Sequence, residues 1–132
     1  NGTIKNPVQA LFNGRPCTWF SPSKTPLAAR KQWIVGTMQP VGSITIDTGA
    51  IEALKKGSSL LPAGIKDVRG NFDRGDVIEI NSESNEKIAI GLAGYSAEDS
   101  NAIKGHKSDE IAKVLSYSHR EEMIHKDDLV LI

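Results

Sequence analysis

The residue types most often used in catalysis are few in this sequence and widely spaced. Histidine occurs at positions 106, 119 and 125, and the single cysteine is Cys17. Two metal ligands on one helix face need an offset of three or four, which the spacing of His119 and His125 does not match. We therefore interpret the histidines as structural, with His125 making a contact at the last strand. Cys17 has no histidine near it in sequence, and we expect a buried, unreactive thiol.

Two further patterns point weakly to chemistry. Asp127 and Asp128 could together bind a divalent cation, but a solvated pair of charges at an edge strand explains them more simply. Gly70 and Gly75 have the glycine spacing of a phosphate-binding loop, yet Asp76-Val77 stands where Lys-Ser/Thr would be needed. The sequence therefore predicts no catalytic residue and no metal site.

Short strands and short helices alternate irregularly along the chain. Alternating polar and apolar residues predict strands at 43–47, 65–69, 77–80, 87–93 and 128–132. Capping residues predict helices that open at 6–7, 25–26, 47–48, 96–97 and 108. Without a regular strand–helix–strand repeat, this order indicates an α+β domain with a small, partly closed sheet.

The most distinctive segment is Ser58-Ser59-Leu60-Leu61-Pro62-Ala63-Gly64-Ile65. Two hydroxyls follow the end of a predicted helix, and an apolar pair, a proline and a glycine then lead into a predicted strand. Gly64 offers no side chain where another group comes close. Two interpretations stay open, a tight helix-to-strand crossing and a contact surface for a partner.

Charge and composition exclude several classes of protein. The 132 residues include 16 Lys/Arg and 16 Asp/Glu, which argues against a general polyanion binder. One cysteine excludes an internal disulfide, and no apolar run approaches the roughly 20 residues of a membrane helix. We expect a cytoplasmic protein with no membrane partner. Its first 66 residues have eight basic and two acidic side chains, whereas the remainder has eight and fourteen.

The distinctive segment and its surroundings resemble the PUA domain family. The resemblance rests on Gly57–Ile65, Val68, Gly70-Asn71-Phe72 and Arg74-Gly75-Asp76-Val77-Ile78. It implies a small mixed or antiparallel β pseudo-barrel flanked by short helices. It also implies a contact surface at the crossing, made by Lys55, Lys56, Ser58, Ser59, Gly64, Ile65, Lys66 and Arg69.

The flanking segments resemble the C-terminal region of glutamate 5-kinases. They are 30–36, 42–50, 103–111, 114–117 and 125–130. The resemblance implies that residues 1–20 are the tail of an α/β amino-acid-kinase domain, 21–42 a linker and 43–132 the PUA domain. Cys17-Thr18-Trp19-Phe20 stands where these kinases usually have Gly-Thr-Leu-Phe.

By this resemblance, the chain is a fragment of an enzyme that phosphorylates L-glutamate in the first step of proline biosynthesis. The parent uses ATP and Mg²⁺, whereas this fragment has neither the catalytic residues nor a cofactor of its own. Its expected partners are its own kinase domain and, in the parent, further copies of the chain. The expected role is regulation or assembly.

The alternative is an RNA-binding PUA domain, but the charge of this chain disfavours RNA binding. Residues 43–94 contain six basic and eight acidic side chains. A protein that contacts several phosphates needs a basic face.

Overall fold

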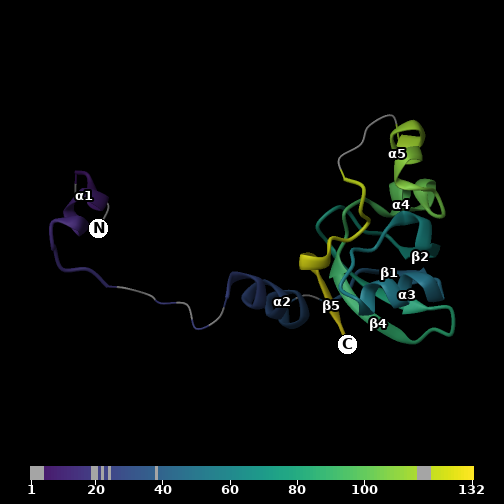
Figure 1. Cartoon of the computed structure of the whole chain (residues 1–132), viewed down its shortest axis with the longest axis horizontal. Coiled ribbons are helices and arrows are strands. Elements are labelled where there is room, and N and C mark those ends of the chain that lie inside the picture. Colours follow the sequence, from purple (N-terminus) through teal and green to yellow (C-terminus); the bar gives the residue numbers. More distant parts are fainter. Residues whose placement is uncertain (1–4, 19–20, 22, 24, 38, 116–119) are drawn as a thin grey trace.

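A five-stranded mixed sheet organises the globular part of the chain (Figure 1). The computed structural model describes residues 5–18, 21, 23, 25–37, 39–115 and 120–132. The strands are β1 (Gly42–Ile46), β2 (Ile65–Gly70), β3 (Val77–Ser82), β4 (Lys87–Leu92) and β5 (Leu129–Leu131). Their order is β2-β1-β3-β4-β5, with β1 and β3 parallel and the other pairs antiparallel. The α+β class predicted from the sequence is confirmed.

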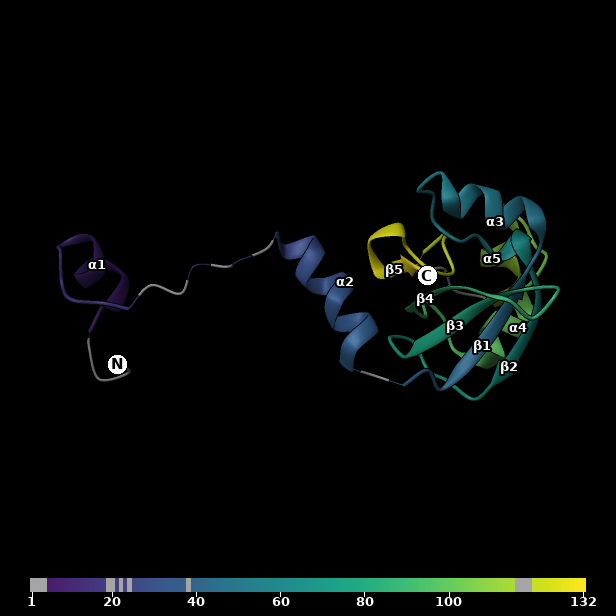
Figure 2. The ribbon, with the colours of Figure 1, turned by 90° about the horizontal axis from the view of Figure 1, so that it is seen from below.

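Within the described ranges, seven helices flank this sheet or precede it. They are α1 (Pro7–Phe12), α2 (Pro26–Thr37), α3 (Thr48–Lys55), η1 (Pro62–Gly64), α4 (Ala97–Ile103), α5 (Ser108–Leu115) and η2 (Lys126–Asp128). Figures 1 and 2 show α1 standing apart from the globular part, at the far end of the segment before α2. Its residues include none that is buried.

Local signals in the sequence explain two of the helix starts. The Asp47 carboxylate accepts a hydrogen bond from the N–H of Ala50 at 2.8 Å and begins α3. The Ser96 hydroxyl accepts from the N–H of Asp99 at 3.2 Å and begins α4. Both bonds satisfy N–H groups that have no partner inside the helix. Helix α3 ends at Lys55, and Gly57 follows its C-cap with a φ of 83°, which only glycine readily adopts.

One large apolar cluster, the main core, joins the sheet to α3, α4, α5 and the C-terminal segment. The alternation of buried residues along β1 and β3 places Ile44, Ile46, Ile78 and Ile80 in it. The other buried members are Leu54, Leu60, Ile65, Val68, Phe72, Ala89, Ala93, Tyr95, Ala97, Ile103, Ile111, Met123, Ile124 and Leu129.

A second, smaller cluster lies under α2. Ile34 is fully buried there against Val77 of β3 and Ile90 of β4, with Leu92 partly buried beside them. Helix α2 also contacts β5 and η2. The segment predicted as a linker thus contains a helix that packs on the globular part. The division of the chain into domains stays a prediction.

The C-terminal segment, residues 120–131, contacts residues near η1 and after β4 before it forms β5. Ile124 pairs with Leu60 in an isolated bridge, and the N–H of Gly94 donates to the carbonyl of Met123 at 2.8 Å. A Cβ on Gly94 would lie 2.6 Å from that carbonyl oxygen, so only glycine permits this approach. The hydroxyl of Tyr95 donates to the carbonyl of Arg120.

Two expectations about single residues are wrong. Cys17 is exposed, because it lies in the segment between α1 and α2, away from both apolar clusters. Asp128 is only 9% exposed, because two arginines surround its carboxylate, so it is not a solvated edge charge. His119 lies outside the described residues.

Candidate contact surface

The predicted contact surface lies where α3 crosses over to β2 by way of η1. The groove at this crossing has a volume of about 390 Å³. Its floor and walls are mainly apolar, and its polar groups come from Asp47, Ser58 and Ser59. The remaining lining residues are Ala50, Ala53, Leu60, Leu61, Ala63 and Gly64. Leu61 is 44% exposed at this groove.

Gly64 is the point of closest approach between η1 and α3. A Cβ placed on Gly64 would lie 2.5 Å from the Cβ of Ala50, well inside van der Waals contact. The carbonyl of Gly64 also accepts the N–H of Asp47 at 3.0 Å. The structure therefore supports the interpretation of this glycine as the small residue that a tight crossing requires.

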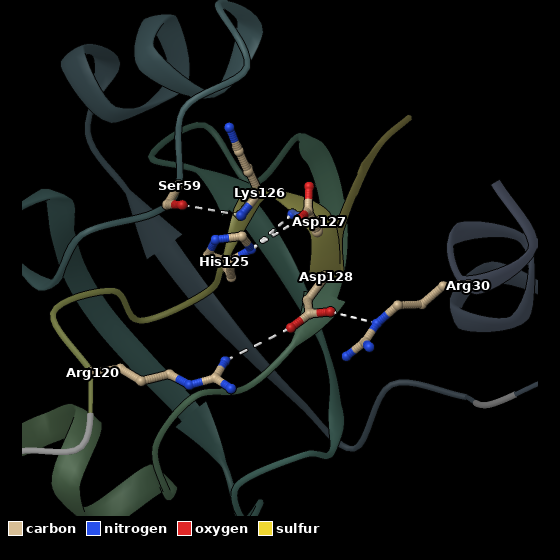
Figure 3. Close-up of polar contacts among 7 residues, drawn as sticks. All are labelled: Arg30, Ser59, Arg120, His125, Lys126, Asp127 and Asp128. Atoms are coloured by element: carbon tan, nitrogen blue, oxygen red, sulfur yellow. Dashed lines mark hydrogen bonds and ion pairs between the residues drawn. The ribbon is translucent and has the colours of Figure 1, made fainter. Parts of the chain in front are cut away.

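The two serines differ in what they contact. Ser58 is exposed, whereas the hydroxyl of Ser59 accepts the N–H of Lys126 at 3.0 Å (Figure 3). That bond joins the crossing to the C-terminal segment. Ser59 therefore has a structural partner already, whereas Ser58 is an exposed residue in the lining of the groove.

The basic side chains of the surface do not converge on the groove. Lys55 and Lys56 are exposed at the end of α3, and neither lines it. The Lys66 ammonium lies 3.9 Å from a carboxylate oxygen of Asp47. Lys66 stands at a bulge in β2, between the residues that pair with Thr45 and Ile46.

Arg69 is also next to a carboxylate. Its Nε donates to Asp67 at 2.8 Å, and this hydrogen bond holds the pKa of Asp67 below its ordinary value. Both side chains are largely exposed. Lys66 and Arg69 thus face local negative charge, which reduces the attraction of this surface for polyanions.

Ile65, the remaining predicted surface residue, is 2% exposed in the main core. Its side chain is not presented to a partner. The structure thus brings Ser58, Ser59 and Gly64 together in the groove, leaves Lys55, Lys56, Lys66 and Arg69 outside its lining, and buries Ile65.

Asp47 and Leu61 contribute to the groove although the sequence did not predict them as contact residues. Asp47 was recognised only as a helix cap, and the same carboxylate faces Lys66. The signal for Leu61 was its place in an apolar pair before a proline.

A second polar site joins α2 to the C-terminal segment (Figure 3). One carboxylate oxygen of Asp128 lies 2.6 Å from Nε of Arg30, and the other lies 3.9 Å from a terminal nitrogen of Arg120. We call Arg30, Arg120 and Asp128 the Asp128 cluster. Burial of a carboxylate is costly unless cations and hydrogen bonds compensate it, and the two arginines provide this compensation.

The described histidines have structural partners. His125 caps η2, the turn before β5, because its Nδ1 accepts the N–H of Asp127 at 3.2 Å. His106 lies 3.4 Å from Glu110, whose pKa is lowered by the N–H of Lys107 and then by His106. Among the described residues, no group of three or more His, Cys, Asp and Glu side chains could hold a metal ion. None of the described helices has the length and apolar character needed to cross a membrane.

Comparison with known proteins identifies both the fold family and a set of close relatives. The profile of the PUA domain matches residues 42–115, more than half of the chain. A glutamate 5-kinase of Agrobacterium fabrum is 52% identical over 131 residues, which are 99% of this chain and 34% of the relative. One from Rhodopseudomonas palustris is 46% identical over 131 residues, 99% of this chain and 35% of the relative. The chain therefore spans about a third of the length of the curated relatives it matches.

A crystal structure of a PUA domain from Aeropyrum pernix K1 is also similar. It is 23% identical with a TM-score of 0.48, and the match covers 64% of this chain and 41% of that one. Likeness at this level carries no argument about a ligand or partner.

Proposed function

The chain belongs to the PUA domain family, and we propose that it is the C-terminal accessory part of a glutamate 5-kinase. The 52% identity to a glutamate 5-kinase along 99% of the chain is the observation that carries this proposal. The complete protein would transfer the γ-phosphoryl group of ATP to the side-chain carboxylate of L-glutamate. It would use Mg²⁺ and act in the cytoplasm.

The contents of the chain fit an accessory role. Phosphoryl transfer depends on metal ions and cationic groups that stabilise the transferred phosphoryl group. In the part of the chain that the structure describes, no acidic cluster suited to a metal is present, and the cations at the crossing are dispersed or next to carboxylates. We infer that catalysis takes place on the other two-thirds of the complete protein.

Helix α1 supports the division of the chain that we propose. It stands apart from the globular part, with Val8 66% and Phe12 81% exposed. Exposed apolar side chains on a short helix indicate that the helix packs against another part of the protein or against a partner. We propose that residues 1–20 pack with the kinase domain, and that this domain is the direct partner of residues 43–132. Self-association of the complete protein stays a prediction.

The RNA-binding alternative is not favoured. Asp47 and Asp67 lie beside Lys66 and Arg69, so the crossing lacks the continuous basic face that phosphate binding needs.

Two proteins test the proposed activity, the complete protein and the chain of residues 1–132. The complete protein should release ADP only when ATP, Mg²⁺ and L-glutamate are all present, and the isolated chain should release none. No glutamate-dependent ADP release by the folded complete protein would contradict the kinase proposal. Release by the isolated chain at the same rate would contradict the accessory role.

A truncation tests whether that role is regulatory. The truncation should begin before Pro26, because a cut at Gly42 would leave Ile34 of α2 without its apolar cover. We expect the truncated protein to keep some activity and to respond differently to L-proline or Mg²⁺. Loss of all activity from a folded truncated protein would argue for a catalytic requirement instead.

A further inference from the structure

Helix α2 contacts β4, β5 and η2, but little of its apolar surface is buried against them. Ile34 fills the small apolar cluster under α2, one helical turn from Arg30, which reaches the Asp128 carboxylate. Other apolar side chains of α2 stay in solvent, with Trp33 45% and Val35 50% exposed. Among the described side chains of α2, Ile34 is the one that is buried, and Arg30 adds an ion pair beside it.

The two side chains of the Arg30–Asp128 ion pair differ in exposure, and the more buried one depends more on the pair. The Asp128 side chain is 12% exposed, whereas that of Arg30 is 53% exposed. If α2 moves away, Arg30 regains water, but Asp128 keeps only Arg120 at 3.9 Å. The buried carboxylate thus favours the docked helix, because docking supplies its nearer cation.

A helix with a single buried side chain among its described residues can open without the sheet. Segments with few buried apolar contacts open locally at a lower free energy than the global unfolding of the domain. Opening would expose Ile34, Val77, Ile90 and Leu92, while the separate main core stays packed.

We propose that α2 docks reversibly on the globular part and that Asp128 is the positioning residue that selects the docked state. Helix α2 links residues 43–132 to everything before Pro26, so docking sets the orientation of the two parts. Reversible docking does not depend on the proposed kinase activity.

Hydrogen exchange of the whole chain tests this proposal. Arg30→Gln removes the nearer cation and Asp128→Asn removes the buried charge. Each should raise the exchange rate of the amides of residues 31–35 about tenfold, a coupling of ordinary size between two groups. Amides of β1 and β3 should exchange as in the unmodified chain. Arg69→Gln, which removes another arginine–carboxylate pair, should leave α2 unchanged.

Two further variants and one protease measurement sharpen the result. Arg30→Lys keeps the charge but loses the Nε contact, so its exchange rate should fall between those of the unmodified chain and Arg30→Gln. Cleavage by trypsin after Lys31 should accelerate in the same order. If Asp128→Asn unfolds the sheet, Arg30→Gln alone decides, because Arg30 lies on α2 and outside every strand.

Equal exchange of the α2 amides in the unmodified chain, Arg30→Gln and Asp128→Asn would overturn the role of Asp128. Unprotected α2 amides in the unmodified chain would overturn docking itself. These outcomes are independent of phosphoryl transfer, so they can be told apart from a failure of the proposed kinase function.

Discussion

The main core and the interface under α2 use the same kinds of side chain but differ in extent and in what joins them. The main core links four strands, three α-helices and the C-terminal segment through a continuous set of buried residues. The α2 interface has three buried apolar side chains, and it depends on the Asp128 cluster besides. The free energy gained by burying apolar surface grows with the buried area, so the main core is stabilised far more than the α2 interface. The difference separates a part that must unfold as a whole from a helix that can leave alone.

A substitution in the middle of β3 should have the largest effect on this comparison. Ile80 is fully buried in the main core, so Ile80→Ala should lower the free energy of unfolding by about 2–5 kcal/mol. Urea denaturation followed by circular dichroism measures the loss. Val8→Ala on the exposed α1 is the control and should change it by less than about 0.5 kcal/mol. A loss for Ile80→Ala no larger than the control's would mean that the main core is not the cooperative unit.

Substitution of Gly64 should have the next largest effect. Gly64→Ala forces a methyl group against the Cβ of Ala50 and should cost about 1–3 kcal/mol, and Gly64→Val should cost more. The matched test is the double variant Gly64→Ala with Ala50→Gly, which restores the space. Ala50→Gly alone should cost about 1 kcal/mol from helix propensity. Additive losses in the double variant would show that the two residues do not touch.

Ile34→Ala should destabilise the chain less than Ile80→Ala although both side chains are fully buried. The loss of stability caused by Ile34→Ala cannot exceed the free energy with which α2 docks, because a larger loss would simply undock the helix. We therefore expect a loss of at most about 2 kcal/mol. Faster exchange of the α2 amides with unchanged β-strand amides would confirm separate opening. If Ile34→Ala lowered the free energy of unfolding as much as Ile80→Ala and all amides exchanged together, the main core and the α2 interface would be one cooperative unit.

The exposed pair at β2 should have the smallest effect. Arg69→Gln removes the hydrogen bond that lowers the pKa of Asp67, so that pKa should rise toward its ordinary value. Because the pKa of Asp67 is depressed in the folded state, the pair stabilises the fold above the unfolded pKa and loses this effect as the pH falls. A pH titration of the Asp67 carboxyl carbon by NMR measures the shift. An unchanged pKa in Arg69→Gln would assign the lowering to another group.

The local features of the fold could be predicted because they are encoded within a few residues. The predicted helix starts at 47–48 and 96–97 are confirmed, with Asp47 and Ser96 as the caps, since a cap acts on its own turn of helix. The parallel pairing of β1 with β3 was not predicted. It depends on contacts between residues more than thirty positions apart, which no local pattern records.

The polar sites were harder to predict for the same reason. The resemblance pointed to Gly64 and the two serines at the crossing, but the burial of Ile65 depends on the tertiary packing of β2. The burial of Asp128 was missed because its nearer partner, Arg30, lies almost a hundred positions away in the sequence and Arg120 reaches it only through the fold of the C-terminal segment. A pair of acidic residues near an apolar strand looks solvated until those partners are known.

The path of the C-terminal segment has a consequence for how the chain is made. Met123, Ile124 and Leu129 complete the main core, and Asp128 supplies the anion that holds α2. Because synthesis proceeds from the N-terminus, the ribosome releases this segment after all the other strands. Until then, the nascent sheet has an open edge at β4 and an unfilled interior. Translational pausing at the codon for Arg120, or a stop codon there, would leave a chain that depends on chaperones.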